Sequence, residues 1–332
     1  MHRTATTSVI SLLRSPAWRQ LALLVIGLIA CSPVARALAA PPAPRQLAPG
    51  VLTTIESNLE PDDTVSTHDI MEIRANPALQ WNPDFFAATE TLVGMADKVK
   101  FRREIYCLEF SFKPLRMIEV DVPVASGGTE RKLVWYLVYS VRNTGQTLKP
   151  VEGPDGVYSA QPAKGGPVRF LPQFVLESQD RQADGKRIIK SYLDRVIPAA
   201  VAAISQREKP GRMLFNSVEI AEQPIPVSDG RIDRGVWGVA TWVDVDPRID
   251  FFSVLVGGLT NAYQWTDNAA AYHPGDSPGR GRRFTHKMLQ LNFWRPGDEL
   301  QPNEREFRYG VPLGNSDLYG VADGVAHRWV YR

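Results

Sequence analysis

The sequence predicts a mainly β protein, an antiparallel β-sandwich of immunoglobulin-like or larger type with two or three short helices. About ten segments of strand length carry alternating or continuous apolar residues. Most of them are joined by short turns rich in glycine, proline and aspartate, as in hairpins. Few segments have a helical pattern, which disfavours the regular alternation of strands and helices in a doubly wound α/β fold.

The first 39 residues are predicted to be a signal peptide. Three arginines and no acidic residue precede a ten-residue apolar run at 21–30, the length of a signal-peptide core, and Ala37–Ala39 fits a cleavage site. A competing interpretation is a lipobox ending at Cys31, which would then carry the lipid. A permanent membrane anchor is the weaker alternative, because the uncharged stretch 20–35 falls short of about 20 apolar residues.

Export changes the charge balance. The whole chain has 38 basic and 36 acidic residues, but its leader contributes four arginines and no acid. Cleavage after Ala39 therefore leaves 34 basic residues and a net charge of −2, and a chain starting at Cys31 has −1. A nearly neutral chain argues against nucleic acid as a partner and leaves a lipid anchor as the only membrane contact. We expect a bacterial periplasmic, cell-surface or extracellular protein.

Cysteine content points to a protein without disulfides. Cys31 is either removed or acylated, so Cys107 has no partner within the mature chain. Its neighbours Tyr106, Leu108 and Glu109 offer no base, so a passive strand thiol is expected instead of a nucleophile.

The mature chain begins with an extended Pro/Ala-rich linker at 40–52 and a helical lead-in at 53–103. Within the lead-in, Pro83 to Val99 has the proline start and apolar spacing of a helix. From Glu104 to Phe112 the period changes to two, which predicts a half-buried strand with Phe110 and Phe112 on one face.

Two hairpins follow in the predicted β region, which extends over 104–332. The first joins 116–124 to 132–141 through Ser126–Thr129, whose glycines suit a tight turn. Its predicted core face consists of Leu133, Trp135, Leu137, Tyr139 and Val141. The second joins 168–177 to 187–193, and Pro172 predicts an edge strand or a bulge there.

One helix and five more strands complete the predicted fold. Residues 197–207 are alanine-rich with proline near the start, which favours a helix. The predicted strands are 217–227, 236–246, 250–259, 284–294 and 325–331. The β region is either one large sandwich or two halves meeting near residue 210.

The chain lacks the familiar signatures of hydrolases, zinc sites and nucleotide-binding loops. His68, His273, His286 and His327 are not at metal-ligand spacing, and His68 lies in a helix-capping context. Arg280, Arg282 and Arg283 form a basic loop tip that is expected to be solvated, with an anion contact as the alternative.

Three aspartates are the best metal candidates. Asp244 and Asp246 project from one strand face, and a following turn could bring Asp250 near. Their carboxylates would then supply the hard oxygen ligands that suit calcium. An ordinary turn at Asp246–Pro247 is the simpler expectation, so no cofactor is predicted. Asp244 and Asp246 are also the acidic residues that a secreted hydrolase would use.

Aromatic and amide side chains on two late segments are the most suggestive feature. If Leu289, Leu291 and Phe293 face the core, the opposite face of that strand carries His286, Gln290, Asn292 and Trp294. Asn261, Tyr263 and Trp265 alternate in the same way after the Gly257–Gly258 break. Flat rings beside amides suit sugar rings or an extended peptide.

Segments 234–265 and 289–299 (RGVWGVATWVDVDPRIDFFSVLVGGLTNAYQW and LQLNFWRPGDE) resemble uncharacterised exported bacterial proteins. The resemblance implies only a shared envelope setting. Together with the residues above, it favours an exported binding or structural protein over an enzyme, with polysaccharide or protein as the expected ligand. A purely architectural role and the acidic hydrolase are the alternatives.

Overall fold

The computed structural model describes residues 52–67, 100–182, 184–208, 210–229, 232–268, 280–296 and 307–332. This part of the chain is mainly β and forms several antiparallel sheets, consistent with the predicted β-sandwich. The expected leader with Cys31, nearly all of the expected linker, and the helix expected at 83–99 lie outside the described residues. None of the described helices combines the length and apolar character that crossing a bilayer requires.

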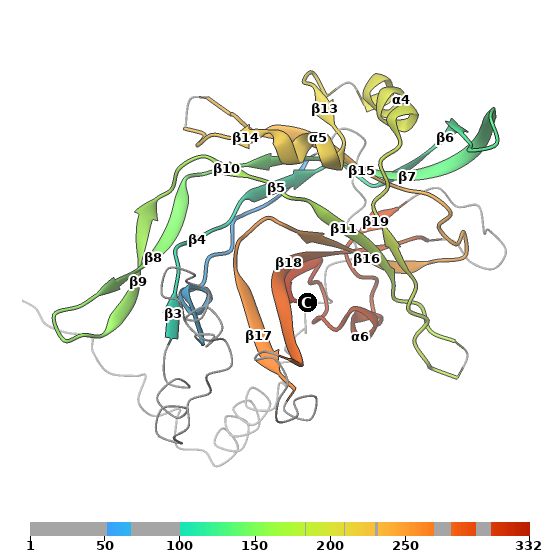
Figure 1. Cartoon of the computed structure of the whole chain (residues 1–332). Helices are drawn as coiled ribbons and strands as arrows, with labels where there is room; N and C mark the ends of the chain where they lie inside the picture. Colours follow the sequence, from blue (N-terminus) through green and yellow to red (C-terminus); the bar gives the residue numbers. More distant parts are fainter. Residues whose placement is uncertain are drawn as a thin grey trace, which may run out of the picture. The chain divides into compact units, whose positions relative to one another are not determined.

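The described part of the chain contains two large sheets (Figure 1). The first has the strand order β1 (Thr53–Ile55), β5 (Glu109–Phe112), β7 (Thr129–Arg142), β15 (Val236–Trp242) and β13 (Leu214–Phe215), with β6 (Arg116–Pro123) also on β7. The second has the order β12 (Ser191–Leu193), β11 (Gln173–Ser178), β16 (Phe251–Gly257), β18 (Arg282–Trp294) and β17 (Tyr263–Asp267). Two further strands, β19 (Arg308–Tyr309) and β20 (His327–Tyr331), also pair with β18.

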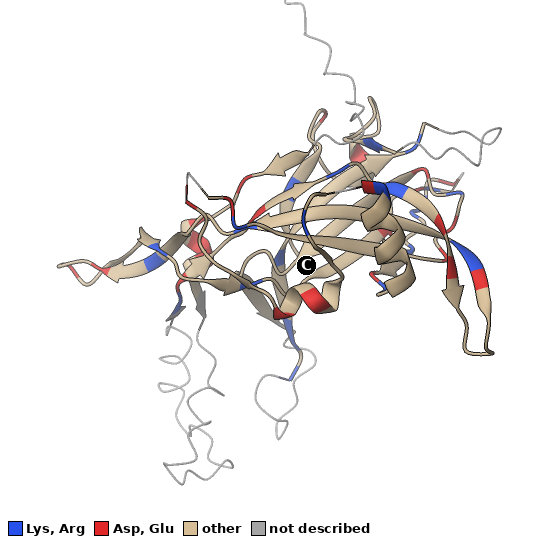
Figure 2. Ribbon diagram, turned by 90° about the horizontal axis from the view of Figure 1, so that it is seen from above, with Lys and Arg blue, Asp and Glu red and all other residues tan. Residues whose placement is uncertain are grey.

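Smaller elements surround these sheets. They are the sheet β4 (Ile105–Tyr106), β8 (Gln146–Glu152) and β9 (Tyr158–Lys164), the pairs β2 (Val65–Thr67) with β3 (Lys100–Arg102) and β10 (Val168–Arg169) with β14 (Pro224–Ile225), the 3-10 helix η1 (Pro61–Thr64), and the helices α4 (Pro198–Glu208), α5 (Ser217–Glu222) and α6 (Ser316–Tyr319). Charged residues of both signs are scattered over the described strands and loops (Figure 2).

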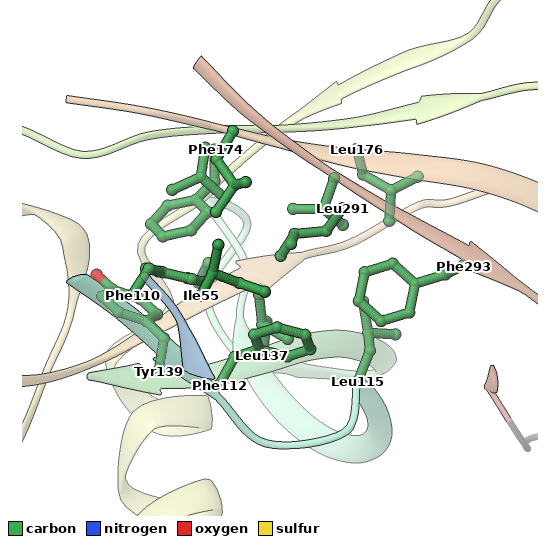
Figure 3. Packing of buried hydrophobic residues seen from close by; sticks show 14 of the residues in the cluster. Ile55, Phe110, Phe112, Leu115, Leu137, Tyr139, Phe174, Leu176, Leu291 and Phe293 are labelled. Atoms are coloured by element: carbon green, nitrogen blue, oxygen red, sulfur yellow. The ribbon is translucent and has the colours of Figure 1, made fainter. Parts of the chain in front are cut away.

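The main core lies between the two large sheets and is rich in aromatic rings (Figure 3). Phe174 of the second sheet packs against Tyr139 of the first, with ring centroids 4.8 Å apart. Trp135 contacts Phe252 at 5.6 Å, and Phe112 contacts Phe293 at 6.1 Å. Residues on both sides of position 210 therefore contribute to one hydrophobic core.

The predicted hairpin of β6 and β7 is confirmed, with Pro123 opposite Thr129 and positive φ at Gly127 and Gly128. Four of its five predicted core residues are buried, whereas Leu133 is 37% exposed. The alternation did not predict that the other face of β7 is buried too. Val134, Tyr136 and Val138 pack in a second cluster with Ala200 and Ile204 of α4, the helix expected at 197–207.

Three predicted elements need correction. Residues 217–222 form α5 and not a strand, because Asn216 and Glu219 make a capping box: Asn216 Oδ1 accepts the N–H groups of Val218 and Glu219. The strand expected at 104–112 is divided into β4 and β5, and its second face is also buried at Ile105 and Cys107. Pro172 lies between β10 and β11, which leaves β11 as an inner strand between β12 and β16.

The second predicted hairpin exists as β11 paired with β12, where Val175 lies opposite Leu193. The described part of the expected helical lead-in contains strands instead, and β1 joins the first sheet by pairing with β5. The β8–β9 hairpin was not predicted from the sequence.

Candidate aromatic binding face

Four rings lie on one face of the arm made by β17 and the first half of β18. Tyr263 lies opposite His286 and Trp265 lies opposite Phe284 in the antiparallel register. Directly opposed residues share a face of a sheet, as do residues two apart on one strand. We call Tyr263, Trp265, Phe284 and His286 the aromatic face. The Tyr263 ring centroid is 6.0 Å from that of Phe284 and 6.3 Å from that of His286.

The aromatic face is accessible to solvent. Phe284 is 52% exposed, an unusual setting for a phenylalanine, and His286 is also exposed. Tyr263 and Trp265 are half-buried. An exposed ring flanked by rings that are already held in place is a surface on which a flat ligand face can stack.

Two arginines fix the half-buried rings. The guanidinium carbon of Arg103 lies 3.8 Å from the Tyr263 ring centroid, and its Nη2 donates to the Tyr263 carbonyl at 2.6 Å. The guanidinium of Arg282 lies 3.6 Å from the Trp265 ring centroid. Such cation–π contacts hold each ring in one orientation.

Asn261 anchors this arm to the neighbouring sheet. Its Oδ1 accepts the N–H of Tyr106 at 3.0 Å, and its Nδ2 donates to the carbonyl of Glu104 at 3.0 Å. Both ends of the amide therefore bind backbone of the same protein. Asn261 positions the aromatic face and is not itself a free hydrogen-bonding group.

Gln290 and Asn292 point away from the main core, as the alternation predicts, but they are buried. Gln290 Nε2 donates to Asn292 Oδ1 at 2.9 Å and to the carbonyl of Tyr319 at 3.3 Å. Asn292 Oδ1 also accepts the Ser253 hydroxyl at 2.9 Å. The segment around α6 covers both amides, so they do not extend the exposed face that the sequence predicts.

Trp294 is the remaining predicted residue and lies apart from the aromatic face. Eight residues separate it from His286 along β18, about 26 Å at roughly 3.3 Å per residue. It is half-buried, with the guanidinium of Arg308 5.0 Å from its ring centroid.

Phe284, Arg103 and Arg282 were missing from the sequence-based site. The two-residue period that places His286 outward also places Phe284 and Arg282 outward, so the sequence pattern could have identified those two as members of the site. No local pattern could have identified Arg103, because it lies 160 residues from Tyr263 in the sequence.

The three candidate metal ligands are held by different cations. Asp244 Oδ1 lies 3.0 Å from Lys132 Nζ, Asp250 Oδ1 lies 3.4 Å from Arg295 Nη2, and Asp246 pairs with Lys190 and Arg248. Hydrogen bonds from Arg248 and Lys190 hold the pKa of the Asp246 carboxyl well below its usual range. The described residues contain no group of three or more side chains arranged to hold a metal ion.

Thermal unfolding is expected at the same temperature with a chelator and with added calcium. Each of the three carboxylates is already neutralised by a protein cation, so calcium would have to break those ion pairs to bind. Differential scanning calorimetry checks this prediction. A melting temperature that calcium raises and a chelator restores would contradict it.

A surface pocket of about 380 Å³ is lined by three aspartates, Asp180, Asp246 and Asp250. Burial raises the pKa of the Asp180 carboxyl. However, Asp180 Oδ1 accepts the N–H of Phe251 at 2.9 Å, and Asp246 is bound by Lys190 and Arg248. Asp250 pairs with Arg295, so all three carboxylates are engaged by other groups of the protein, and Asp244 does not line the pocket.

Cys107 is buried, and burial raises the pKa of its thiol to about 12. The thiol is therefore neutral at physiological pH, which is the expected passive behaviour.

No protein-family model, no curated protein and no solved structure matches this chain. The function of the aromatic face must be inferred from its own geometry.

Proposed function

We propose that this chain is an exported bacterial binding protein, secreted or held in the cell envelope, that binds a carbohydrate polymer on the aromatic face. The observation that carries the proposal is the alignment of Tyr263, Trp265, Phe284 and His286 on one side of the β17–β18 arm, with Phe284 exposed. Export is supported by the basic and apolar leader, with cleavage after Ala39 or lipidation at Cys31.

The shape of the surface favours a polymer. Small-molecule sites are concave and bury most of their ligand, whereas this face lies on a two-stranded part of a sheet. Peptides usually add to a strand edge or fill a groove, and here the rings are on the face of the sheet. The apolar face of a sugar ring can stack on Phe284, and rings fixed by Arg103 and Arg282 lose little entropy on binding.

Binding is better supported than hydrolysis. Hydrolysis by two carboxylates requires a pair that can bind and protonate a substrate. In the described part of the chain, Asp244 and Asp246 instead form ion pairs with separate cations.

Replacing Phe284 or Trp265 by alanine is expected to weaken glycan binding by roughly fivefold, about 1 kcal/mol, because each change removes one stacking surface. The experiment measures the mature protein on sedimented peptidoglycan sacculi, chitin and cellulose, and on soluble dextran and mannan by affinity electrophoresis. Leu193→Ala is the matched control, since Leu193 is 69% exposed on β12 of the same sheet.

Wild-type protein that binds none of these glycans would contradict the proposal, as would binding that Phe284→Ala leaves unchanged. Binding to unstructured peptides in place of glycans would assign the face to a protein ligand and also overturn it.

A further inference from the structure

The outer face of the second large sheet carries a buried polar patch, on the same side of β18 as the aromatic face and further along the strand. It consists of Glu177, Gln179, Ser253, Gln290 and Asn292, all under 9% exposed. The Ser253 hydroxyl lies at its centre, 3.3 Å from Gln179 Nε2 and 3.4 Å from Gln290 Nε2. Gln179 Nε2 also lies 3.3 Å from Glu177 Oε1. These side chains therefore form one connected hydrogen-bond network.

Three arginines, Arg187, Arg328 and Arg332, converge on this patch. Arg187 Nη2 donates to Gln179 Oε1, and Arg328 Nε donates to Gln290 Oε1 at 3.1 Å. Arg332 Nη1 donates to Glu177 Oε2 at 2.7 Å. Because the three acceptors belong to one network, the three guanidinium groups are neighbours although they come from a loop and from the C-terminal strand segment.

The end of α6 holds two of these arginines. Arg187 Nη2 donates to the carbonyl of Leu318 at 3.2 Å, and Arg328 Nη1 donates to the carbonyl of Gly320. Figure 1 shows α6 close to β16, the strand that contributes Ser253. The guanidinium groups are thus positioned before any ligand arrives, which lowers the entropic cost of binding.

Three guanidinium groups face one paired side-chain carboxylate in this cluster, as far as the described residues show. Glu177 is the one carboxylate that pairs with these three arginines among the described residues. The nearby Asp317 pairs with Arg181 at 2.9 Å, and Asp180 accepts backbone N–H groups. Burial lowers the pKa of the Arg328 guanidinium, and the positive charges of Arg332 and Arg187 lower it further. The arrangement is one that an added negative charge would stabilise.

The three arginines have further N–H donors with which they could bind an anion. A guanidinium has five N–H donors, and the contacts above use two of Arg187, two of Arg328 and one of Arg332. Arg187 is exposed, and the Arg332 side chain is 40% exposed, so a ligand can approach from solvent. Planar forks of this kind match the oxygens of a phosphate group.

We propose that Arg187, Arg328 and Arg332 form an anion site that binds a phosphate group, either as free phosphate or on a lipid headgroup. The site adjoins the aromatic face, because Arg332 exchanges both backbone hydrogen bonds with His286, but the proposal does not rest on glycan binding.

Adding inorganic phosphate is expected to raise the thermal unfolding temperature above that in chloride at equal ionic strength, because a ligand of the folded state stabilises it. Isothermal titration calorimetry measures the affinity directly. Arg187→Gln and Arg332→Gln are each expected to weaken phosphate binding by about tenfold or more, since each removes a charge-assisted donor. Arg131→Gln, an exposed arginine on β7, is the control and should bind phosphate as the wild type does.

A second experiment measures binding to vesicles containing phosphatidylglycerol, with neutral phosphatidylcholine vesicles for comparison. Binding of free phosphate supports a soluble ligand, and binding of anionic vesicles alone, lost in both variants, supports a lipid headgroup. If neither probe binds, or if both variants bind as the wild type does, the cluster only caps α6 and the proposal is overturned.

Discussion

Lys287→Met is expected to lower the free energy of unfolding by about 3–5 kcal/mol, because it leaves a buried carboxylate without its counter-charge. Lys287 Nζ lies 2.6 Å from Asp63 Oδ2, and each side chain is only 2% exposed. The Tyr331 hydroxyl also donates to Asp63, but a neutral hydroxyl does not replace the ammonium charge. Urea denaturation followed by tryptophan fluorescence measures the change.

Two further variants separate the charge from the packing. Asp63→Leu combined with Lys287→Met removes both charges and should recover much of the lost stability, since an apolar pair is tolerated where a lone buried charge is not. Lys132→Met is the matched control: its amine lies 3.0 Å from Asp244, but this pair is exposed, so stability should hardly change. Equal urea midpoints for Lys287→Met and wild type would show that the buried pair does not hold the N-terminal segment.

This ion pair illustrates what local sequence patterns miss. The two-residue period places Lys287 on the same face as Leu289 and Leu291, which marks it as an inward-facing lysine that needs a partner. Its partner lies 224 residues away, in a segment for which the sequence predicts a helical lead-in. No periodicity within either segment reports such a distant contact.

Hairpins were predicted well because their signals are local. The β6–β7 hairpin has alternating apolar residues on both sides of a glycine turn, and its register follows from that turn. Residues 217–222 were wrongly predicted as a strand because their apolar content outweighed the Asn216–Glu219 capping box, which is equally local. The helix could therefore have been predicted, whereas the parallel pairing of β13 with β15 could not.

For the candidate site, the alternation of apolar and polar residues identified the two faces of each strand, but not which segments of the chain pack over those faces. It placed Tyr263 and Trp265 on one face of their segment and His286 outward on its own strand, and the antiparallel register of β17 and β18 brings the three to one side of the arm. The same rule placed Gln290 and Asn292 outward, yet a segment about 30 residues later in the chain covers them. The period of a strand distinguishes its two faces, but burial of the second face depends on tertiary contacts.

Phe174→Ala is expected to destabilise the protein by about 3–5 kcal/mol, the range for removing a large buried aromatic side chain. Phe174 is 2% exposed and contacts four other rings, those of Phe110, Tyr139, Phe170 and Trp242. Phe110, Tyr139 and Trp242 belong to the first large sheet and Phe174 to the second, so the cavity would weaken the packing that holds the sheets together. Thermal and urea unfolding measure the loss.

Phe284→Ala provides the matched control, because the same side chain is removed from a site that is 52% exposed. Its unfolding free energy should stay within about 0.5 kcal/mol of the wild type, as for surface substitutions that disturb no special feature. If Phe174→Ala were as stable as Phe284→Ala, the aromatic core could not be what joins the two sheets. If both were strongly destabilised, Phe284 would belong to the packing of the arm, and its exposure would no longer support a ligand-binding role.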